Sequence, residues 1–101
     1  MEKRKPHYAL TDIKRAFSNP GALNRTVTSR TGADDLGMDD DRVVAVIQAL
    51  ANSDFDKSMT SFANHKLWQD VYRPVVDDRV VYLKFTLDDQ QAFLLISFKE
   101  A

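Results

Sequence analysis

Residues 57–74 read KSMTSFANHKLWQDVYRP and open a C-terminal half in which the sequence favours β-strands throughout. From residue 55 onward, apolar and polar residues alternate with the period of two that is typical of strands. The pattern predicts four strands, over residues 55–62, 67–73, 79–87 and 92–99. The connections between them are short, so sequential antiparallel pairing is the expected topology.

Each predicted strand carries one polar side chain with a chemical use, in the order Lys57, Gln69, Tyr82 and Lys99. Alternate residues of a strand share a face, so paired neighbouring strands can bring these four side chains onto one surface of the sheet. That possible meeting point is the candidate functional site.

Alternation also predicts which face of the sheet is buried. The apolar face of the third strand consists of Val81, Leu83, Phe85 and Leu87. In the fourth strand one face consists of Leu94, Ile96 and Phe98. Tyr82 and Lys99 then lie on the face away from most of the core. Helices must cover the apolar face, which gives a two-layer α+β domain.

The first third of the chain is predicted to contain one helix and a short strand. Thr11 has the side chain of an N-cap, and Asn19-Pro20-Gly21 ends the helix that it starts. Residues 7–10 are either an edge strand or a lead-in to this helix. Residues 23–28 are rich in β-branched side chains, which favours a short strand.

Two further helices are predicted before the strands begin. Ser29 or Thr31 can cap a brief helix that stops at Leu36-Gly37. Apolar residues at offsets of three and four indicate an amphipathic helix over residues 40–52. Asp39, Asp40 and Asp41 stand at its N-terminal end, where carboxylates favour the helix dipole. Three neighbours at one helix start cannot encircle an ion, so no metal site is expected there.

Composition excludes several classes of protein. The 101 residues are enough for one domain, 1–101, and not for two. There is no cysteine, which excludes disulfides, Cys-ligated metals and thiol nucleophiles. No signal peptide or membrane span is recognisable, so we expect a cytoplasmic protein. The net charge is −1, but residues 1–31 are basic and residues 32–56 are acidic.

The remaining polar residues suit phosphate and RNA chemistry without a cofactor. Lys57, Lys84, Lys99 and Arg73 can stabilise charge on a phosphate transition state. Tyr82 can transfer a proton and Gln69 can hydrogen-bond a phosphate or a base edge. The aromatic residues that could stack on bases are Phe62, Trp68 and Tyr72.

Each of these residues also has an ordinary structural explanation. A lysine on a strand is usually a solvated edge residue, and Trp68 and Tyr82 can be packing residues. His65 falls in a predicted hairpin connection, where it either reaches substrate or caps the turn. His7 is the other neutral-pH acid–base candidate.

Several blocks along nearly the whole chain carry a family resemblance. The blocks are Met1-Glu2-Lys3-Arg4, Pro6-His7, Ala33-Asp34-Asp35-Leu36-Gly37, Ser53-Asp54-Phe55, Lys57-Ser58-Met59-Thr60, Trp68-Gln69-Asp70-Val71-Tyr72-Arg73-Pro74, Val81-Tyr82-Leu83-Lys84 and Ser97-Phe98-Lys99-Glu100. With them the chain resembles the MqsR (motility quorum-sensing regulator) toxins, ribonucleases of type II toxin–antitoxin systems. The continuous block over residues 68–74 is far more specific than a short pattern.

The resemblance implies a fold, an activity and a site. The fold is the RelE-like small ribonuclease fold, with helices on a mainly antiparallel sheet. The activity is that of an mRNA interferase, which inhibits translation and growth by cutting single-stranded message at GC-containing sites without a metal. The family's catalytic set maps onto Lys57, Gln69, Tyr82 and Lys99. Met59 and Arg73 match positions at or near the family's site, and Lys84 is a further candidate for binding substrate.

The resemblance also implies a partner, an antitoxin with a zinc-binding N-terminal domain and a helix-turn-helix domain that binds operator DNA. One departure concerns position 56, where the family often has tyrosine and this chain has Asp56. An acid there either weakens RNA binding or points to the opposite face of the strand. The alternative function is a catalytically degenerate toxin homologue that binds antitoxin and modulates its DNA binding without cutting RNA.

Overall fold

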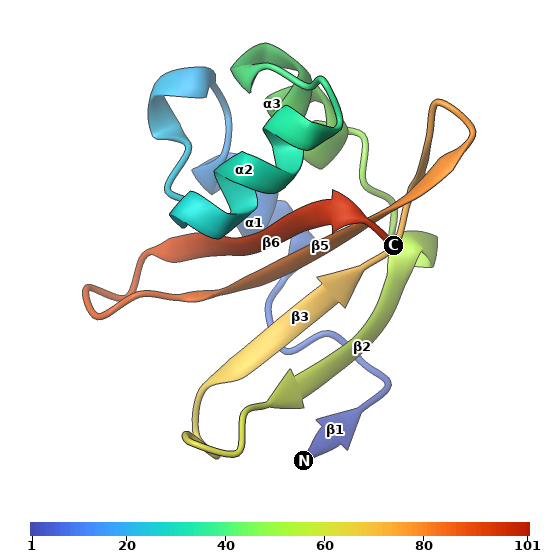
Figure 1. Cartoon of the computed structure of the whole chain (residues 1–101). Helices are drawn as coiled ribbons and strands as arrows, with labels where there is room; N and C mark the ends of the chain where they lie inside the picture. The colour runs from blue at the N-terminus through green and yellow to red at the C-terminus, as the bar shows by residue number, and fades with distance from the viewer.

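Six antiparallel strands form a sheet in the order β1-β2-β3-β5, with β4 and β6 also paired to β5 (Figure 1). The structure is a computed structural model that describes all of residues 1–101. The strands are β1 (Glu2–Lys3), β2 (Phe55–Thr60), β3 (Trp68–Tyr72), β4 (Val75–Val76), β5 (Arg79–Leu87) and β6 (Phe93–Glu100). The four strands predicted from alternation are confirmed, and β1 and β4 are additional.

Three α-helices gather on one side of β5 and β6, while β1 and the β2–β3 hairpin extend away from them (Figure 1). The helices are α1 (Leu10–Ala16), α2 (Val27–Asp35) and α3 (Asp40–Gln48). Short 3-10 helices, η1 (Pro20–Ala22) and η2 (Asn52–Asp54), follow α1 and α3. This is the predicted α+β arrangement, consistent with a RelE-like fold.

The sheet continues past a proline. Pro74 has no backbone N–H to donate to a ladder, and β3 ends two residues before it. The chain resumes pairing immediately afterwards, because Val75 pairs with Val80 and Val76 with Arg79. Strand β4 therefore follows β3 along the same neighbour, β5.

The N-terminal arm, residues 1–9, is fixed by one buried carboxylate. Asp70 on β3 is fully buried and accepts hydrogen bonds from the backbone N–H of His7 at 3.0 and 3.2 Å and of Tyr8 at 2.9 Å. The hydroxyl of Ser58 on β2 donates to the same carboxylate at 2.5 Å. These bonds tie the N-terminal arm across two strands before α1 begins.

That anchoring decides one open alternative and corrects one expectation about the first helix. Residues 7–9 are not a strand but a lead-in, and the edge strand lies earlier, at Glu2–Lys3. Thr11 lies inside α1 and is not its N-cap; the N-cap is Ala9, which makes no side-chain cap bond. The helix starts where the chain leaves the Asp70 carboxylate, so a tertiary contact overrides the local cap signal. The predicted stop before Asn19-Pro20-Gly21 is confirmed.

The strand predicted over residues 23–28 is wrong. Only one bridge forms there, between Arg25 and Leu95, and Val27 already begins α2. The N-cap is Thr26, whose side-chain oxygen accepts from the backbone N–H of Ser29 at 3.1 Å. The predicted helix exists, but neither Ser29 nor Thr31 caps it. Thr26 satisfies an otherwise free helix donor, and this outweighs the strand preference of its β-branched neighbours.

The other two helix boundaries agree more closely with the sequence. Helix α2 ends at Asp35 with Leu36 as its C-cap, and the next residue, Gly37, has a φ of 70°, which favours glycine. Asp39 caps α3 by accepting from the N–H of Arg42 at 2.9 Å. Helix α3 ends at Gln48 with Ala49 as its C-cap, four residues before the predicted end, and η2 begins at Asn52.

A cluster of buried apolar side chains joins the two layers. Among its members are Phe17 on α1, Ile47 on α3, Phe85 on β5, and Leu95 and Phe98 on β6. Regular alternation predicts that Leu95 and Phe98 lie on opposite faces. Both are buried because the pairing shifts register: Lys84 pairs with Ser97, but Phe85 pairs with Leu95. The extra residue, Ile96, forms a bulge that turns both side chains inward.

Candidate active site

A row of directly paired residues crosses four strands of the sheet. Lys57 pairs with Val71, Val71 with Lys84, and Lys84 with Ser97. Directly paired residues share a face of the sheet. Leu83, the neighbour of Lys84 on β5, points into the core, and successive residues of a strand point to opposite faces. The side chains of this row therefore face away from the helices. Strands lie ~4.8 Å apart, which places the backbones of Lys57 and Lys84 about 10 Å from each other.

Tyr82 lies at the centre of a cationic group on this face. It is two residues from Lys84 on β5 and pairs directly with Lys99 on β6. The Nζ atoms of Lys84 and Lys99 lie 5.6 and 5.4 Å from the centroid of the Tyr82 ring. Neither lysine makes an ion pair with a carboxylate. Both ammonium groups are therefore available to an anionic ligand beside a phenol hydroxyl.

Lys57 has a different environment, set by the N-terminal arm. Its Nζ lies 3.6 Å from the carboxylate of Glu2 on β1. Arg4 contacts that same carboxylate at 3.4 Å and the carboxylate of Asp56 at 3.6 Å. The pairing of β2 with β3 is irregular between Phe55 and Lys57, so Asp56 stands outside the regular ladder. Asp56 therefore pairs with Arg4 of the N-terminal arm.

Neither Glu2 nor Arg4 carries a sequence signal that connects it with the site. Both lie more than fifty positions from Lys57 along the chain, and the two-residue strand that carries Glu2 gives no periodic signal. Their approach depends on the pairing of Glu2 with Met59 and of Lys3 with Ser58.

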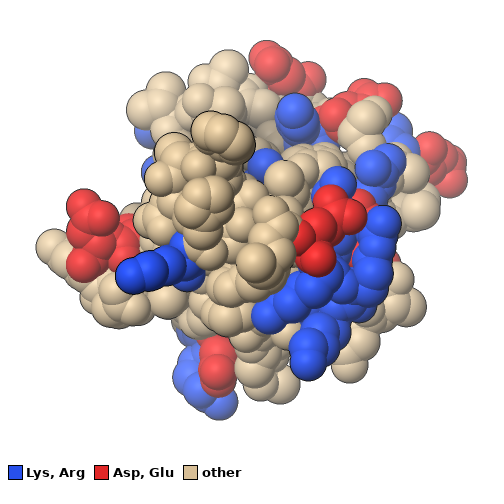
Figure 2. Space-filling model, turned by 90° about the horizontal axis from the view of Figure 1, so that it is seen from below, with Lys and Arg blue, Asp and Glu red and all other residues tan.

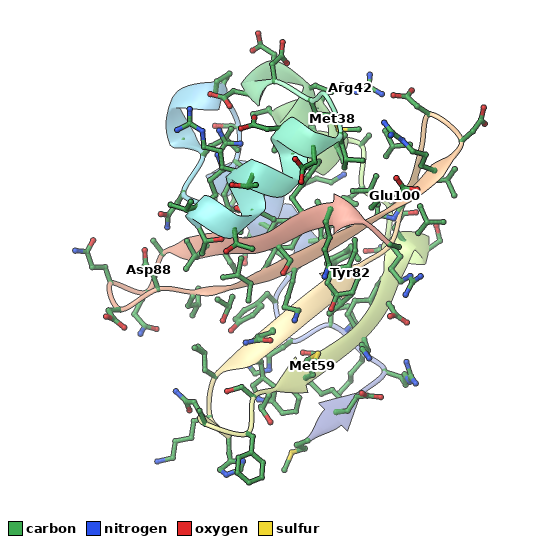
Figure 3. The ribbon with its side chains drawn as sticks, in the orientation of Figure 1. Met38, Arg42, Met59, Tyr82, Asp88 and Glu100 are labelled. Atoms are coloured by element: carbon green, nitrogen blue, oxygen red, sulfur yellow. The ribbon has the colours of Figure 1, made fainter.

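Gln69 lies at the other end of the same face. It pairs directly with Met59, and both are half-buried. The antiparallel register places Gln69 and Tyr82 on opposite sides of the Val71–Lys84 pair, four residues apart along the strands. At ~3.3 Å per residue their backbones are about 13 Å apart along the strand direction. Figure 3 shows Met59 and Tyr82 correspondingly separated along the sheet.

The predicted residues therefore form an extended surface and not one tight cluster. Lys84, Tyr82 and Lys99 are adjacent, Lys57 stands across Val71 from Lys84, and Met59 and Gln69 continue the surface along β2 and β3. Arg73 is exposed and directly follows Tyr72, which pairs with Leu83, so its backbone lies near that of Tyr82.

Trp68 is covered by the N-terminal arm. The His7 ring stacks on it with centroids 5.3 Å apart, and the Lys3 Nζ lies 4.1 Å from a Trp68 ring centroid. Lys3 also contacts His7 Nδ1 at 3.0 Å. Partial burial and the neighbouring ammonium of Lys3 lower the pKa of His7, against the opposing effect of Asp70. Neither His7 nor Trp68 faces the row that carries the lysines.

Tyr72 belongs to the core. Its side chain is fully buried and its hydroxyl has no hydrogen-bond partner. Burial, with a smaller contribution from the charge of Asp70, raises the pKa of Tyr72 to about 12. Of the three aromatic residues predicted to stack on bases, Phe62 alone is exposed. It lies in the β2–β3 loop with His65, 6.4 Å away between ring centroids.

The charges are distributed unevenly over the surface. Seen from below, Lys and Arg side chains gather on one side around a small acidic group, and most other acidic side chains lie toward the edges (Figure 2). No three His, Asp or Glu side chains are grouped so that they could hold a metal ion. None of the helices has the length and apolar character needed to cross a bilayer.

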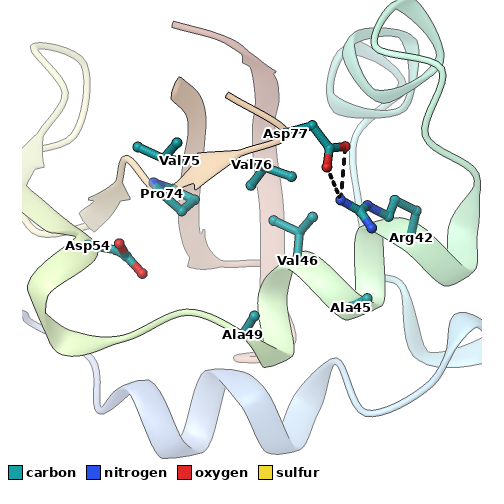
Figure 4. A pocket seen from close by; sticks show the side chains of 9 residues that line it. All are labelled: Arg42, Ala45, Val46, Ala49, Asp54, Pro74, Val75, Val76 and Asp77. Carbon is teal, nitrogen blue, oxygen red and sulfur yellow. Dashed lines mark hydrogen bonds and ion pairs between the residues drawn. The ribbon is translucent and has the colours of Figure 1, made fainter. Parts of the chain in front are cut away.

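A separate cleft of about 410 Å³ lies between α3 and β4 (Figure 4). Ala45, Ala49 and Val75 line it, and an ion pair between Arg42 and Asp77 at 2.9 Å closes one side. Its lining contains none of the residues of the sheet face described above.

Comparison with known proteins gives a consistent match over the whole chain. The family model described as "Motility quorum-sensing regulator, toxin of MqsA" matches residues 5–100. A curated relative, the "mRNA interferase toxin MqsR" of Escherichia coli (strain K12), is 45% identical over 100 residues. That alignment covers 99% of this chain and 99% of the relative.

Proposed function

The chain belongs to the MqsR family of toxins, and on that premise we propose that it cuts RNA on the face of the sheet that carries Lys57, Lys84 and Lys99. It is an endoribonuclease of the mRNA interferase type and the toxin of a toxin–antitoxin pair. The proposal concerns how this chain's own residues perform that activity. Catalytic roles belong to Lys57, Gln69, Tyr82 and Lys99, and substrate contacts to Met59, Arg73 and Lys84.

In the proposed reaction the RNA attacks itself. The 2′-oxygen forms a bond to the adjacent phosphorus, and the bond from phosphorus to the 5′-oxygen breaks. The 2′-hydroxyl loses a proton and the departing 5′-oxygen gains one, which leaves a 2′,3′-cyclic phosphate and a 5′-hydroxyl. Charge accumulates on the phosphate oxygens in the transition state, so fixed cations beside them lower the barrier.

Lys99 and Lys57 hold and neutralise the phosphate in this proposal, and Lys84 binds the neighbouring backbone. Tyr82 donates or accepts a proton at the scissile group, because its hydroxyl is on the ring that the two ammonium groups of Lys84 and Lys99 flank. Gln69 orients the RNA farther along the strand. No step requires a metal ion.

One observation supports the site assignment most strongly. Lys84 and Lys99 flank Tyr82 on an uncovered sheet face, and neither has a carboxylate partner. A single unpaired lysine on a strand is usually only solvated, whereas two unpaired ammonium groups beside one phenol suit an anion.

The finer features of the activity are also proposals. We propose single-stranded message as substrate, cut at sites that contain a GC dinucleotide, in the cytoplasm. We further propose an antitoxin partner with a zinc-binding domain and a helix-turn-helix domain, through which the toxin contacts operator DNA indirectly. Adding such an antitoxin to the cleavage reaction should suppress the cuts.

The test is incubation of purified protein with a defined single-stranded RNA in the presence of EDTA, followed by mapping of the cut ends. Lys57→Ala, Tyr82→Phe and Lys99→Ala should each slow cleavage by ~100-fold or more, the typical cost of a lost charge-stabilising contact. Lys14→Ala removes a lysine of α1 and should cleave at the wild-type rate.

Three outcomes would contradict the proposal. Cleavage that persists in all three variants would discard the residues and keep the activity. Cleavage abolished by EDTA would show that a metal is needed. Wild-type protein that binds RNA and antitoxin without cutting would favour the degenerate toxin homologue.

A further inference from the structure

We propose that the tip of the β2–β3 hairpin is a base-stacking subsite, in which the ring of Phe62 stacks on one unpaired base of the substrate RNA. Lys66 and His65 of the same loop contact the phosphate next to that base. The inference rests on the proposed function, because it extends the RNA path along the sheet beyond Met59 and Gln69.

Phe62 is the one aromatic ring of this chain that is left in water. Its relative exposure is 98%, whereas each of the other nine Phe, Tyr and Trp side chains is buried or half-buried. A single exposed apolar residue is common on protein surfaces, so exposure alone does not identify a site. The neighbouring charges and the position of the loop supply the additional observations.

The loop is held in a defined shape by its own polar side chains. The Ser61 hydroxyl accepts a hydrogen bond from the backbone N–H of Asn64 at 3.0 Å. The Asn64 side-chain oxygen accepts from the N–H of Lys66 at 3.0 Å. These bonds close the turn locally and leave the Phe62 ring directed into solvent, with the His65 ring near its edge. A loop backbone that is already held in this shape loses little conformational freedom when a base stacks on the ring.

Charge distinguishes this hairpin tip from the other two. The β4–β5 turn carries Asp77 and Asp78, and the β5–β6 turn carries Asp88 and Asp89. The residues that join β2 to β3 include Lys66 and no acidic residue. A polyanion approaching the sheet is therefore repelled at two tips and accepted at the third. The three tips point to different corners of the molecule in Figure 1.

The position of the loop is also suitable. It directly continues β2 beyond Met59 and precedes Gln69 on β3, the pair that ends the candidate active site on this side. Trp68 cannot serve instead because His7 and Lys3 cover it, and Tyr72 is in the core. An RNA strand that lies over Lys57 and leaves past Gln69 meets Phe62 next. Stacking is tolerant of sequence, since every base has a π face, so this subsite adds affinity without fixing base identity.

The experiment measures binding of a short RNA with one 2′-deoxynucleotide at the cut site, which removes the attacking hydroxyl. Phe62→Ala and Phe62→Leu should each raise Kd by about 5- to 100-fold, the range expected for loss of one stacked base, and Phe62→Trp should not. Leucine keeps an apolar side chain without a π face. At saturating all-RNA substrate the cleavage rate should be unchanged, because Phe62 does not touch the scissile phosphate. Val75→Ala, which truncates an exposed apolar side chain on β4, is the matched control.

A scan with single abasic nucleotides locates the base. An abasic nucleotide at one position should weaken RNA binding by the wild-type protein as much as Phe62→Ala does. The same abasic nucleotide should not weaken RNA binding by the Phe62→Ala variant any further. Wild-type affinity of the Phe62→Leu protein would overturn the inference while leaving the nuclease intact. Unchanged RNA binding by Phe62→Ala, combined with weaker neutralisation by antitoxin, would assign the ring to a protein contact instead. Absence of RNA binding by wild-type protein would contradict the proposed function itself.

Discussion

Replacing Asp70 by alanine should release the N-terminal arm and strongly destabilise the fold, although the residue stands in the block that carries Gln69 and Arg73. The carboxylate is fully buried and accepts from three donors: the N–H groups of His7 and Tyr8 and the hydroxyl of Ser58. Its role is thus to hold the arm across β2 and β3, and it makes no contact on the lysine-bearing face.

The size of the effect follows from those contacts. A hydrogen bond to a charged group contributes about 1.5–3 kcal/mol, and a buried donor left without a partner costs about 1–3 kcal/mol. The arm can detach and rehydrate, which limits the loss, so we expect Asp70→Ala to lower the free energy of unfolding by about 3–5 kcal/mol. Asp70→Asn keeps an oxygen for the two N–H groups, and the Ser58 hydroxyl can rotate to accept from the amide. The expected loss is then about 1–2 kcal/mol.

The assay is thermal and urea unfolding together with amide hydrogen exchange. For a domain of this size 1 kcal/mol corresponds to at least ~4 °C in Tm, so Asp70→Ala should lower Tm by more than about 10 °C. Exchange at His7 and Tyr8 should accelerate in that variant before the core opens. Asp89→Ala, at an exposed position of the β5–β6 turn, should stay within about 0.5 kcal/mol of wild type. A Tm within about 2 °C of wild type for Asp70→Ala, with slow exchange at both amides, would show that Asp70 does not hold the N-terminal arm.

Three further substitutions test other parts of the structure. Gly32→Ala should lower the free energy of unfolding by about 1–3 kcal/mol and reduce cleavage. A Cβ at this position would lie 1.9 Å from the carbonyl oxygen of Phe98 and would push α2 away from β6. Differential scanning calorimetry measures the loss of stability. Tyr72→Phe should be neutral or stabilising by up to about 2 kcal/mol at pH 7, because the buried hydroxyl has no partner. Burial raises the pKa of Tyr72 to about 12, so the free energy of unfolding of the wild type should fall as pH rises from 10 through 12. Unfolding measured against pH should show that Tyr72→Phe lacks this contribution to the fall. Glu2→Gln removes the carboxylate beside Lys57 and should tighten RNA binding by at most about fivefold at low salt, with no difference at high salt, as measured by titration with labelled RNA.

Much of the C-terminal half could be predicted from the sequence, because each strand there is long enough to show its period. The face that carries Lys57, Lys84 and Lys99 follows from alternation together with short antiparallel connections. The bulge at Ile96 could not be predicted in this way. It depends on fitting both Leu95 and Phe98 into the core, which only the packed structure decides.

The N-terminal third was harder to predict, because tertiary contacts choose between competing local signals there. Thr11 has the right side chain for an N-cap, yet the Asp70 carboxylate sets where the chain turns, and the N-cap is Ala9, two residues earlier. Thr26 and its neighbours have strand propensity, but one hydrogen bond to Ser29 starts a helix instead. The contact between Glu2 and Lys57 could not be predicted either, since a strand of two residues is too short to show a period.

A net charge of −1 does not conflict with a nuclease that binds a polyanion, because salt screens charges over ~8 Å at physiological ionic strength. Seven of the fifteen acids lie at the start of α3 and on the β4–β5 and β5–β6 turns, whereas Lys84 and Lys99 stand unpaired around Tyr82. An RNA phosphate at that position responds to the two ammonium groups within a few ångströms more than to carboxylates at distant corners. The same acids repel RNA from the start of α3 and from two hairpin tips. In the proposed function this distribution of charge favours RNA at the lysine-bearing face over those acidic regions, a preference that a uniformly basic protein of this size would lack.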